Sequence, residues 1–168
     1  MKKLLLAAGL VLVVAGYLYY HYSTPRVLER RVDSLLSEMN FGLVSLGEHG
    51  DAADKFASHF AETVTFSGSE SPLFESEEGR AALRKLYLEY RTFAKSSSAE
   101  RIGDTQVTVA DSTTAEVATT VAFRLTFHGT DGGDQRELPV VLTFEKLAGD
   151  WLISKVEMQG KALEDVDF

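Results

Sequence analysis

The feature that most restricts the fold of this chain is a long alternation of side-chain character between Ala115 and Phe127. Apart from Thr119, apolar residues occupy every second position of this run, and polar or small residues lie between them. A period of two is typical of a β-strand with one buried face. A fully extended strand of this length would reach about 43 Å, so we expect it to bend or to carry a bulge.

Further alternating segments precede and follow this run. Residues 105–109 and 138–144 each alternate in the same way. In the last segment, residues 151–153 are out of phase with residues 156–158, which predicts a bulge near residues 154–155. The second half of the domain therefore predicts four antiparallel strands joined by hairpins.

The first half of the domain has helical spacing instead. Apolar residues recur every three or four positions from Pro25 to Met39, and again from about Asp51 to Glu62. A short strand is predicted over Glu62–Phe66. A third helix is predicted to begin with Ser76 as its N-cap and to continue to about Ala94. Helices that precede a group of strands indicate an α+β fold.

An apolar segment lies at the N-terminus. Residues 4–20 carry no charged side chain, and a helix continued to residue 25 would reach about 33 Å, enough for a hydrocarbon core of about 30 Å. Tyrosines between residues 17 and 22 are typical of a membrane interface. Two interpretations remain open: residues 1–22 form a retained single-pass anchor, or they contain a signal peptide cleaved near residues 14–16.

Both interpretations predict that the following domain lies outside a bacterial inner membrane, on the periplasmic side. Under the first, residues 4–22 form the membrane contact. The formal net charge of −8 argues against a nucleic-acid partner, because such proteins present a basic face. The chain contains no cysteine, and no second histidine lies at ligand spacing from His59, so we predict neither a metal site nor a cofactor.

Three stretches resemble a known superfamily. Residues 56–66 (FASHFAETVTF) are similar to the second helix and first strand of the nuclear-transport-factor-2-like proteins, also called SnoaL-like or cystatin-like. Residues 79–84 (GRAALR) are similar to the start of their third helix. Residues 149–153 (GDWLI) are similar to their last hairpin, where the pattern Gly-x-Trp-x-Ile recurs. The resemblance extends over about residues 26–160.

The resemblance implies a domain over residues 23–161, which is followed by a short acidic tail at residues 162–168. The implied fold is a curved antiparallel sheet with three helices on its concave face, shaped like a cone and preceded here by a single transmembrane helix. Dimers through the outer sheet face are common in this superfamily. Small or apolar residues on the expected outer face are compatible with such a homodimer and equally with a plain solvent-facing surface: Ala118, Thr120, Ala122 and Val141.

The resemblance also predicts where catalytic groups would lie. Members similar to ketosteroid isomerase place an acid at the end of the first strand and a second acid on a later strand. The matching positions here are Ser67-Gly68 and Val141, and the first helix has Leu35, Leu36 and Met39 where a tyrosine would be needed. None of these residues can transfer a proton. A SnoaL-type pair would need an inward histidine, whereas we expect His59 at the flank of its helix and His128 outside.

We therefore predict no catalytic residues. Aromatic residues that could line the cone are the candidates for a ligand pocket, with ordinary core packing as the alternative role of each: Phe66, Tyr87, Tyr90, Phe123, Phe127 and Trp151. The favoured function is a membrane-tethered, non-catalytic binding or assembly module with a protein partner. The alternative is a carrier or enzyme that takes a small apolar molecule into the cone.

Overall fold

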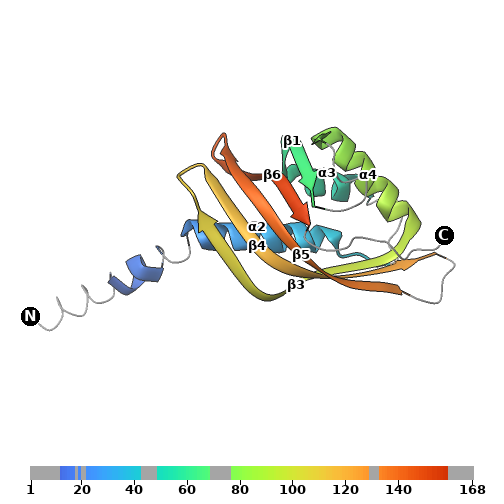
Figure 1. Cartoon of the computed structure of the whole chain (residues 1–168), viewed down its shortest axis with the longest axis horizontal. Coiled ribbons are helices and arrows are strands. Elements are labelled where there is room, and N and C mark those ends of the chain that lie inside the picture. The colour runs from blue at the N-terminus through green and yellow to red at the C-terminus, as the bar shows by residue number, and fades with distance from the viewer. Residues whose placement is uncertain are drawn as a thin grey trace, which may run out of the picture.

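Six strands form one curved sheet, in the order β2-β1-β6-β5-β4-β3 (Figure 1). The computed structural model describes residues 12–17, 19, 22–42, 49–68, 77–128 and 133–158. Its elements follow the chain as α2 (Thr24–Met39), α3 (His49–Ser58), β1 (Phe60–Ser67), β2 (Glu77–Gly79), α4 (Arg80–Phe93), β3 (Ala94–Val109), β4 (Thr114–Phe127), β5 (Gly133–Leu147) and β6 (Asp150–Met158).

The sheet is mixed, so the prediction of an antiparallel sheet was wrong at one pair of strands. β1 runs parallel to β6, while the other neighbouring strands are antiparallel. The difference follows from the topology. The last four strands are consecutive and pair with their neighbours in sequence, whereas β1 comes from the first half of the chain and joins the far side of β6. The α+β class itself is confirmed.

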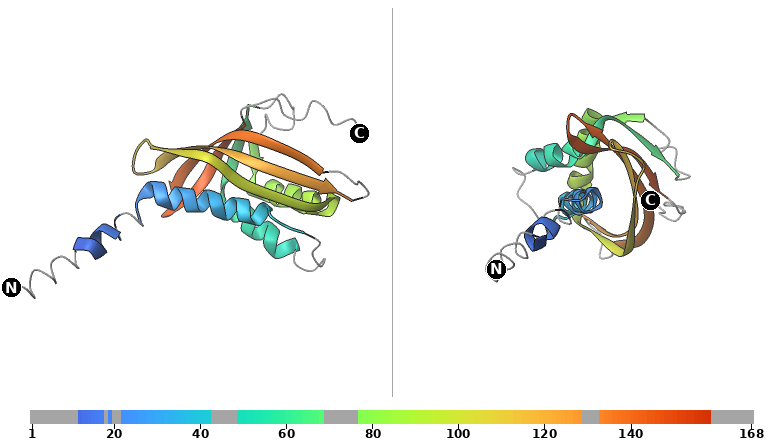
Figure 2. Two further views of the ribbon diagram at one scale, coloured as in Figure 1. Left: turned by 90° about the horizontal axis from the view of Figure 1, so that it is seen from below. Right: turned by 90° about the vertical axis from the view of Figure 1, so that its left-hand side faces the viewer.

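Helix α2 lies along the concave side of the sheet, where the right-hand view of Figure 2 shows it almost end-on. Leu28, Val32 and Leu35 on its inner side are buried. They join a core cluster that includes Val117 of β4 and Phe144 of β5. Each such side chain contributes about 2 kcal/mol by leaving water, which makes this layer the main stabilising contact of the domain.

The predicted long strand is confirmed as β4, with Ala115 and Val117 buried and Glu116 exposed between them. The bulge that accommodates the curvature lies in the neighbouring strand, between Ile102 and Gln106 of β3. Here Gly103 adopts a φ of 67°, a conformation that glycine tolerates best. The predicted bulge in the last strand is confirmed, because Thr143 pairs with Lys155 and Phe144 with Ile153, which leaves Ser154 unpaired.

Three predicted boundaries were wrong. The second helix ends at Ser58, and Phe60 already belongs to β1. The third helix begins at Arg80, because residues 77–79 form β2 against residues 63–65 of β1. Strand β3 begins at Ala94 directly after α4, well before the predicted start at residue 105, and the three serines at 96–98 are paired with β4. In each case sheet pairing overrides the local preference for a helix or a turn.

The predicted membrane segment is only partly described. Residues 12–17 are helical and stand away from the sheet (Figure 1), and the side chains of Leu12, Val13 and Tyr17 are exposed. Within the described residues, no helix is both long enough and apolar enough to cross a bilayer. Residues 1–11 and the predicted acidic tail at residues 162–168 lie outside the described part of the chain.

Candidate functional site

Helix α4 brings together an aromatic cluster, which we define as Phe41, Phe56, Tyr87, Tyr90 and Phe123. The ring centres of Phe56 and Tyr87 lie 4.4 Å apart and are stacked. Tyr90 lies 6.1 Å from Tyr87 and 6.4 Å from Phe123, while Phe41 meets Tyr90 edge-on at 5.5 Å. The cluster therefore joins α3, α4, β4 and Phe41, which lies two positions after the end of α2, on the concave side of the sheet.

The two tyrosines at the centre of the cluster are hydrogen-bond donors. The Tyr87 hydroxyl donates to the backbone carbonyl oxygen of Glu38, and the Tyr90 hydroxyl donates to Oγ of Ser97. Burial raises the pKa of Tyr87 and raises that of Tyr90 to about 12. Both phenols are therefore protonated near neutral pH and cannot serve there as general bases.

Arg91 of α4 lies beside this cluster and is buried, with 8% of its surface exposed. Its guanidinium carbon is 4.7 Å from the ring centre of Phe41 and 5.7 Å from that of Tyr87. Its Nε atom has no hydrogen-bond partner within the part of the chain that the structure describes. Among the ion pairs of the described residues none involves Arg91.

The six predicted pocket residues fall into three groups. Tyr87, Tyr90 and Phe123 meet in the aromatic cluster. Trp151 is buried in the main core, and Phe66 packs against the same core. Phe127, at the end of β4, is 39% exposed. Only the first group lies in the aromatic cluster. A ligand-binding role for any of the six residues stays a prediction.

Arg91 was not among the predicted site residues. Arg91 lies four residues after Tyr87, and residues at this spacing share one face of a helix. That spacing was the available signal. A formal charge normally indicates an exposed position, and the fold reverses this preference because aromatic rings cover the guanidinium.

In this chain, the positions that match the catalytic acids of isomerase-like proteins carry no acid. At the end of β1, Gly68 has a φ of 92°, and a Cβ added there would lie 2.4 Å from the carbonyl oxygen of Met158. Val141 lies opposite Ala118 and next to the buried Val140, so it points to the outer face of the sheet. Within the described part of the chain, no carboxylate is buried.

His59 is buried, so the prediction that it lies at the flank of a helix was wrong. It follows α3 and leads into β1, where its carbonyl oxygen accepts a hydrogen bond of 2.9 Å from the backbone of Ile153. Burial and the positive charge of Arg31 lower the pKa of His59. His128 is exposed, as expected.

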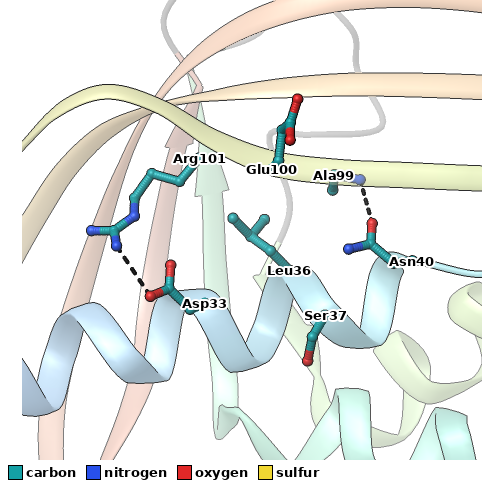
Figure 3. Close-up of a pocket in the computed structure, with 7 residues that line it drawn as sticks. All are labelled: Asp33, Leu36, Ser37, Asn40, Ala99, Glu100 and Arg101. Atoms are coloured by element: carbon teal, nitrogen blue, oxygen red, sulfur yellow. Dashed lines mark hydrogen bonds and ion pairs between the residues drawn. The ribbon is translucent and has the colours of Figure 1, made fainter.

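The surface between α2 and β3 holds a cleft of about 230 Å³ (Figure 3). Arg101 of β3 reaches across to Asp33 of α2, with 3.1 Å between Nη2 and Oδ2. Asn40 accepts a hydrogen bond from the backbone N–H of Ala99 at one end of the cleft. These polar groups are already paired with each other, so we assign the cleft to the contact between α2 and β3. The described residues contain no cluster of three metal-ligating side chains.

A scan against sequence models of protein families and a search of curated protein sequences both found no match. Solved structures do match. A Novosphingobium aromaticivorans protein assigned as a scytalone dehydratase is 18% identical over 79% of this chain and 80% of its own, with a TM-score of 0.61. The association domain of CaMKII from C. elegans is 10% identical over 84% and 99%, with a TM-score of 0.59.

A third match names the superfamily. A nuclear transport factor 2-like protein from Salmonella enterica serovar Typhimurium is 10% identical over 84% of this chain and 94% of its own, with a TM-score of 0.59. Identities this low show the fold alone. The chain therefore has the cystatin-like fold that the nuclear-transport-factor-2-like proteins share, and the matched structures include both an enzyme and an association domain.

Proposed function

We propose that this chain is a non-catalytic binding and assembly module, which pairs with a second copy through its outer sheet face and is held at a membrane by residues 4–22. The observation that carries the proposal is the absence of a buried carboxylate from the described residues. Proton-transfer chemistry in an apolar cone needs a tuned acid or base, and the position at the end of β1 is Gly68, which has no room for a side chain.

The remaining ionisable groups on the concave side do not replace such an acid. Tyr87 and Tyr90 remain protonated near neutral pH and donate to neighbouring oxygens. The guanidinium of Arg91 offers hydrogen-bond donors and no acceptor. His59 lies between α3 and β1, where its backbone is hydrogen-bonded to Phe56 of α3 and to Ile153 of β6. The concave side is consequently better suited to binding and support than to catalysis.

The outer sheet face offers a surface for assembly. Ile102, Thr120 and Pro139 form one row across β3, β4 and β5, and Ala118 and Val141 form part of the next row. Apart from the exposed Pro139, these side chains are half-buried in the single chain. Small and apolar residues of this kind allow two sheets to approach closely, as in packed β-sandwiches.

The charges at the edge of this surface are arranged for self-association. Glu116 and Arg124 are both exposed on the outer face of β4, four positions before and after Thr120. A two-fold axis that crosses β4 near Thr120 would place Glu116 of each copy opposite Arg124 of the other. A symmetric interface always repeats its contacts in this reciprocal way, so one pairing supplies two ion pairs.

The structural matches support an assembly role without establishing it. One of them is named as the association domain of a kinase, whereas another is assigned as a dehydratase. The same fold carries both kinds of function, so the local chemistry must decide between them. Here the interior lacks a described buried acid, and the outer face has a reciprocal pattern of charges.

The membrane tether rests on the composition of residues 4–22 and on the exposure of its described part. Leu12 and Tyr19 are 73% and 83% exposed, so the domain does not cover them. Exposed apolar and aromatic side chains in one short segment are typical of a membrane contact. If the tether is present, the full chain stays in the membrane fraction after washing at alkaline pH. Release into the wash would contradict it.

Assembly is tested by the mass of the full chain in detergent, measured by light scattering on a sizing column. We expect a dimer for the wild type and a monomer for Thr120→Arg, because the substitution places two like charges on the symmetry axis. The matched control is Thr92→Arg, an exposed position on α4, and it should remain dimeric. Loss of the dimer in both variants, or in neither, would reject the outer face as the interface.

A second function, carriage of a small molecule, is favoured by one specific observation. Arg91 has an unsatisfied Nε among aromatic rings, and such a group has the chemistry to hold an anionic ligand. Native mass spectrometry distinguishes the two functions. A carrier would retain an extra mass of a few hundred daltons per chain, whereas an assembly module would not.

A further inference from the structure

Arg91 is a buried cation that the described residues leave without a counter-ion. Its Nε has no hydrogen-bond partner among the described residues, and no ion pair of this part of the chain includes it. Buried charges in proteins are normally paired, because an isolated charge loses its hydration on burial without compensation. The Nε–H of Arg91 therefore lacks an acceptor among the described residues, although another part of the guanidinium interacts with the Tyr87 side chain.

The surrounding rings compensate this buried charge only in part. Phe41 lies 4.7 Å from the guanidinium carbon and Tyr87 lies 5.7 Å away, so aromatic faces stabilise the positive charge. The N–H donors of a guanidinium lie in its plane and point outward from its edge. An aromatic face does not accept these bonds well. The edge that carries Nε consequently remains the place where an acceptor is missing.

We propose that the Nε edge of Arg91 binds the carboxylate of a small organic acid, whose apolar part packs against Phe41 and Tyr90. A carboxylate fits a guanidinium edge because two parallel N–H···O bonds form at once. Phe41 and Tyr90 meet edge-on at 5.5 Å and supply an aromatic wall next to the cation. The ligand is an acid with an apolar body.

Phe41 is the residue that must move to admit such a ligand. It follows the end of α2 and pairs with Ser97 through two backbone hydrogen bonds, of 3.0 and 2.9 Å. This isolated bridge lies outside the named strands, and its ring is half-buried. The small exposed fraction of Arg91 means that the ring covers the guanidinium in the free protein.

The proposed site is independent of the assembly surface. The aromatic cluster lies on the concave side, whereas Thr120 and its neighbours lie on the outer face. A dimer could form without any acid bound, and an acid could bind to a monomer. An experiment that rejects the acid site would therefore leave the proposed dimer standing, and the reverse also holds.

The test uses sodium benzoate as the probe and benzamide as its neutral match, with the full chain in detergent. The Nε–H resonance of Arg91 is followed by NMR during each titration. We expect a saturable shift with benzoate and no saturation with benzamide. Arg91→Lys removes one of the two parallel hydrogen bonds to the carboxylate, so it should weaken benzoate binding about tenfold or more. Lysine keeps the charge but lacks the planar edge.

The control variant is Arg30→Gln, which removes an exposed arginine from α2 and should leave benzoate binding unchanged. Equal binding of benzoate and benzamide would overturn the proposal, as would undiminished binding to Arg91→Lys. Absence of a saturable shift of the wild-type Arg91 signal would also overturn it. That last measurement needs no substitution, so it decides the matter even if the lysine variant does not fold.

Discussion

A Cβ atom on Gly68 would lie 2.4 Å from the backbone carbonyl oxygen of Met158, at the point where β1 and β6 end side by side. This close approach removes a side chain from the position where isomerase-like proteins with this fold carry an acid. A backbone oxygen cannot retreat as the end of a flexible side chain can, and the φ of 92° adds strain for any other residue.

Gly68→Asp is therefore expected to destabilise the protein rather than to install a catalytic acid. The combined clash and backbone strain should cost about 3 kcal/mol or more of unfolding free energy, measured by urea denaturation. Gly103→Ala is the matched control. Gly103 also has a positive φ, of 67°, but has open space around its Cβ, so this change should cost only about 1 kcal/mol. Equal losses in the two variants would show that the contact with Met158 is unimportant.

Charge reversal tests the reciprocal pairing of Glu116 and Arg124. Glu116→Arg or Arg124→Glu alone should weaken the dimer, because each copy would then place like charges opposite one another. The double variant restores opposite charges and should recover the dimer. The readout is the dimer dissociation constant from sedimentation at low salt, where screening is weakest. A double variant that dissociates as readily as the single ones would contradict the proposed symmetry.

His59 should make stability fall under mildly acidic conditions. Burial, with the nearby charge of Arg31, lowers its pKa in the folded state below the ordinary value of 6.5. The unfolded chain then binds a proton that the folded chain rejects, so unfolding becomes easier as the pH falls from about 6.5 towards the folded-state pKa. His59→Gln should flatten this part of the stability profile. An unchanged slope between pH 7 and pH 5 in the variant would assign the effect to other groups.

Tyr90 should have the opposite dependence at alkaline pH. Burial raises its folded-state pKa from 10.0 to about 12. Between these values the unfolded chain loses the phenolic proton first, so stability is present below pH 10 and is lost as the pH rises. Ultraviolet titration of the wild type against Tyr90→Phe isolates its ionisation. A Tyr90 signal that titrates near pH 10 in the folded protein would mean that the ring is accessible to water.

Periodicity along the chain predicted the main elements because it reports which face of each element is buried. The alternation of residues 115–127 and the phase shift near Ser154 both appear in the sheet as expected. The parallel pairing of β1 with β6 had no such local signal. It depends on where a strand from the first half of the chain joins the sheet, and only the packing of the whole domain determines this.

The candidate site was predictable only in part. Tyr87 and Tyr90 were found because aromatic residues on an apolar helix face are expected to point inward. Phe41 was missed because it lies after a helix, outside any periodic segment. Arg91 was missed because a charged side chain on a helix is normally expected to face solvent. Its spacing of four residues from Tyr87 would have placed it on the buried face. Its burial depends on the rings of two separate elements, and their meeting is a property of the folded chain.

Native mass spectrometry of the full chain, released from detergent micelles, tests the central claim most directly. It reports the number of copies and any retained small molecule in one spectrum. The account predicts a dimer of the polypeptide, with or without its N-terminal segment and with or without a small acid bound at Arg91. A monomer at micromolar concentration would contradict the assembly function. A monomer that also retained a bound molecule would favour the carrier instead.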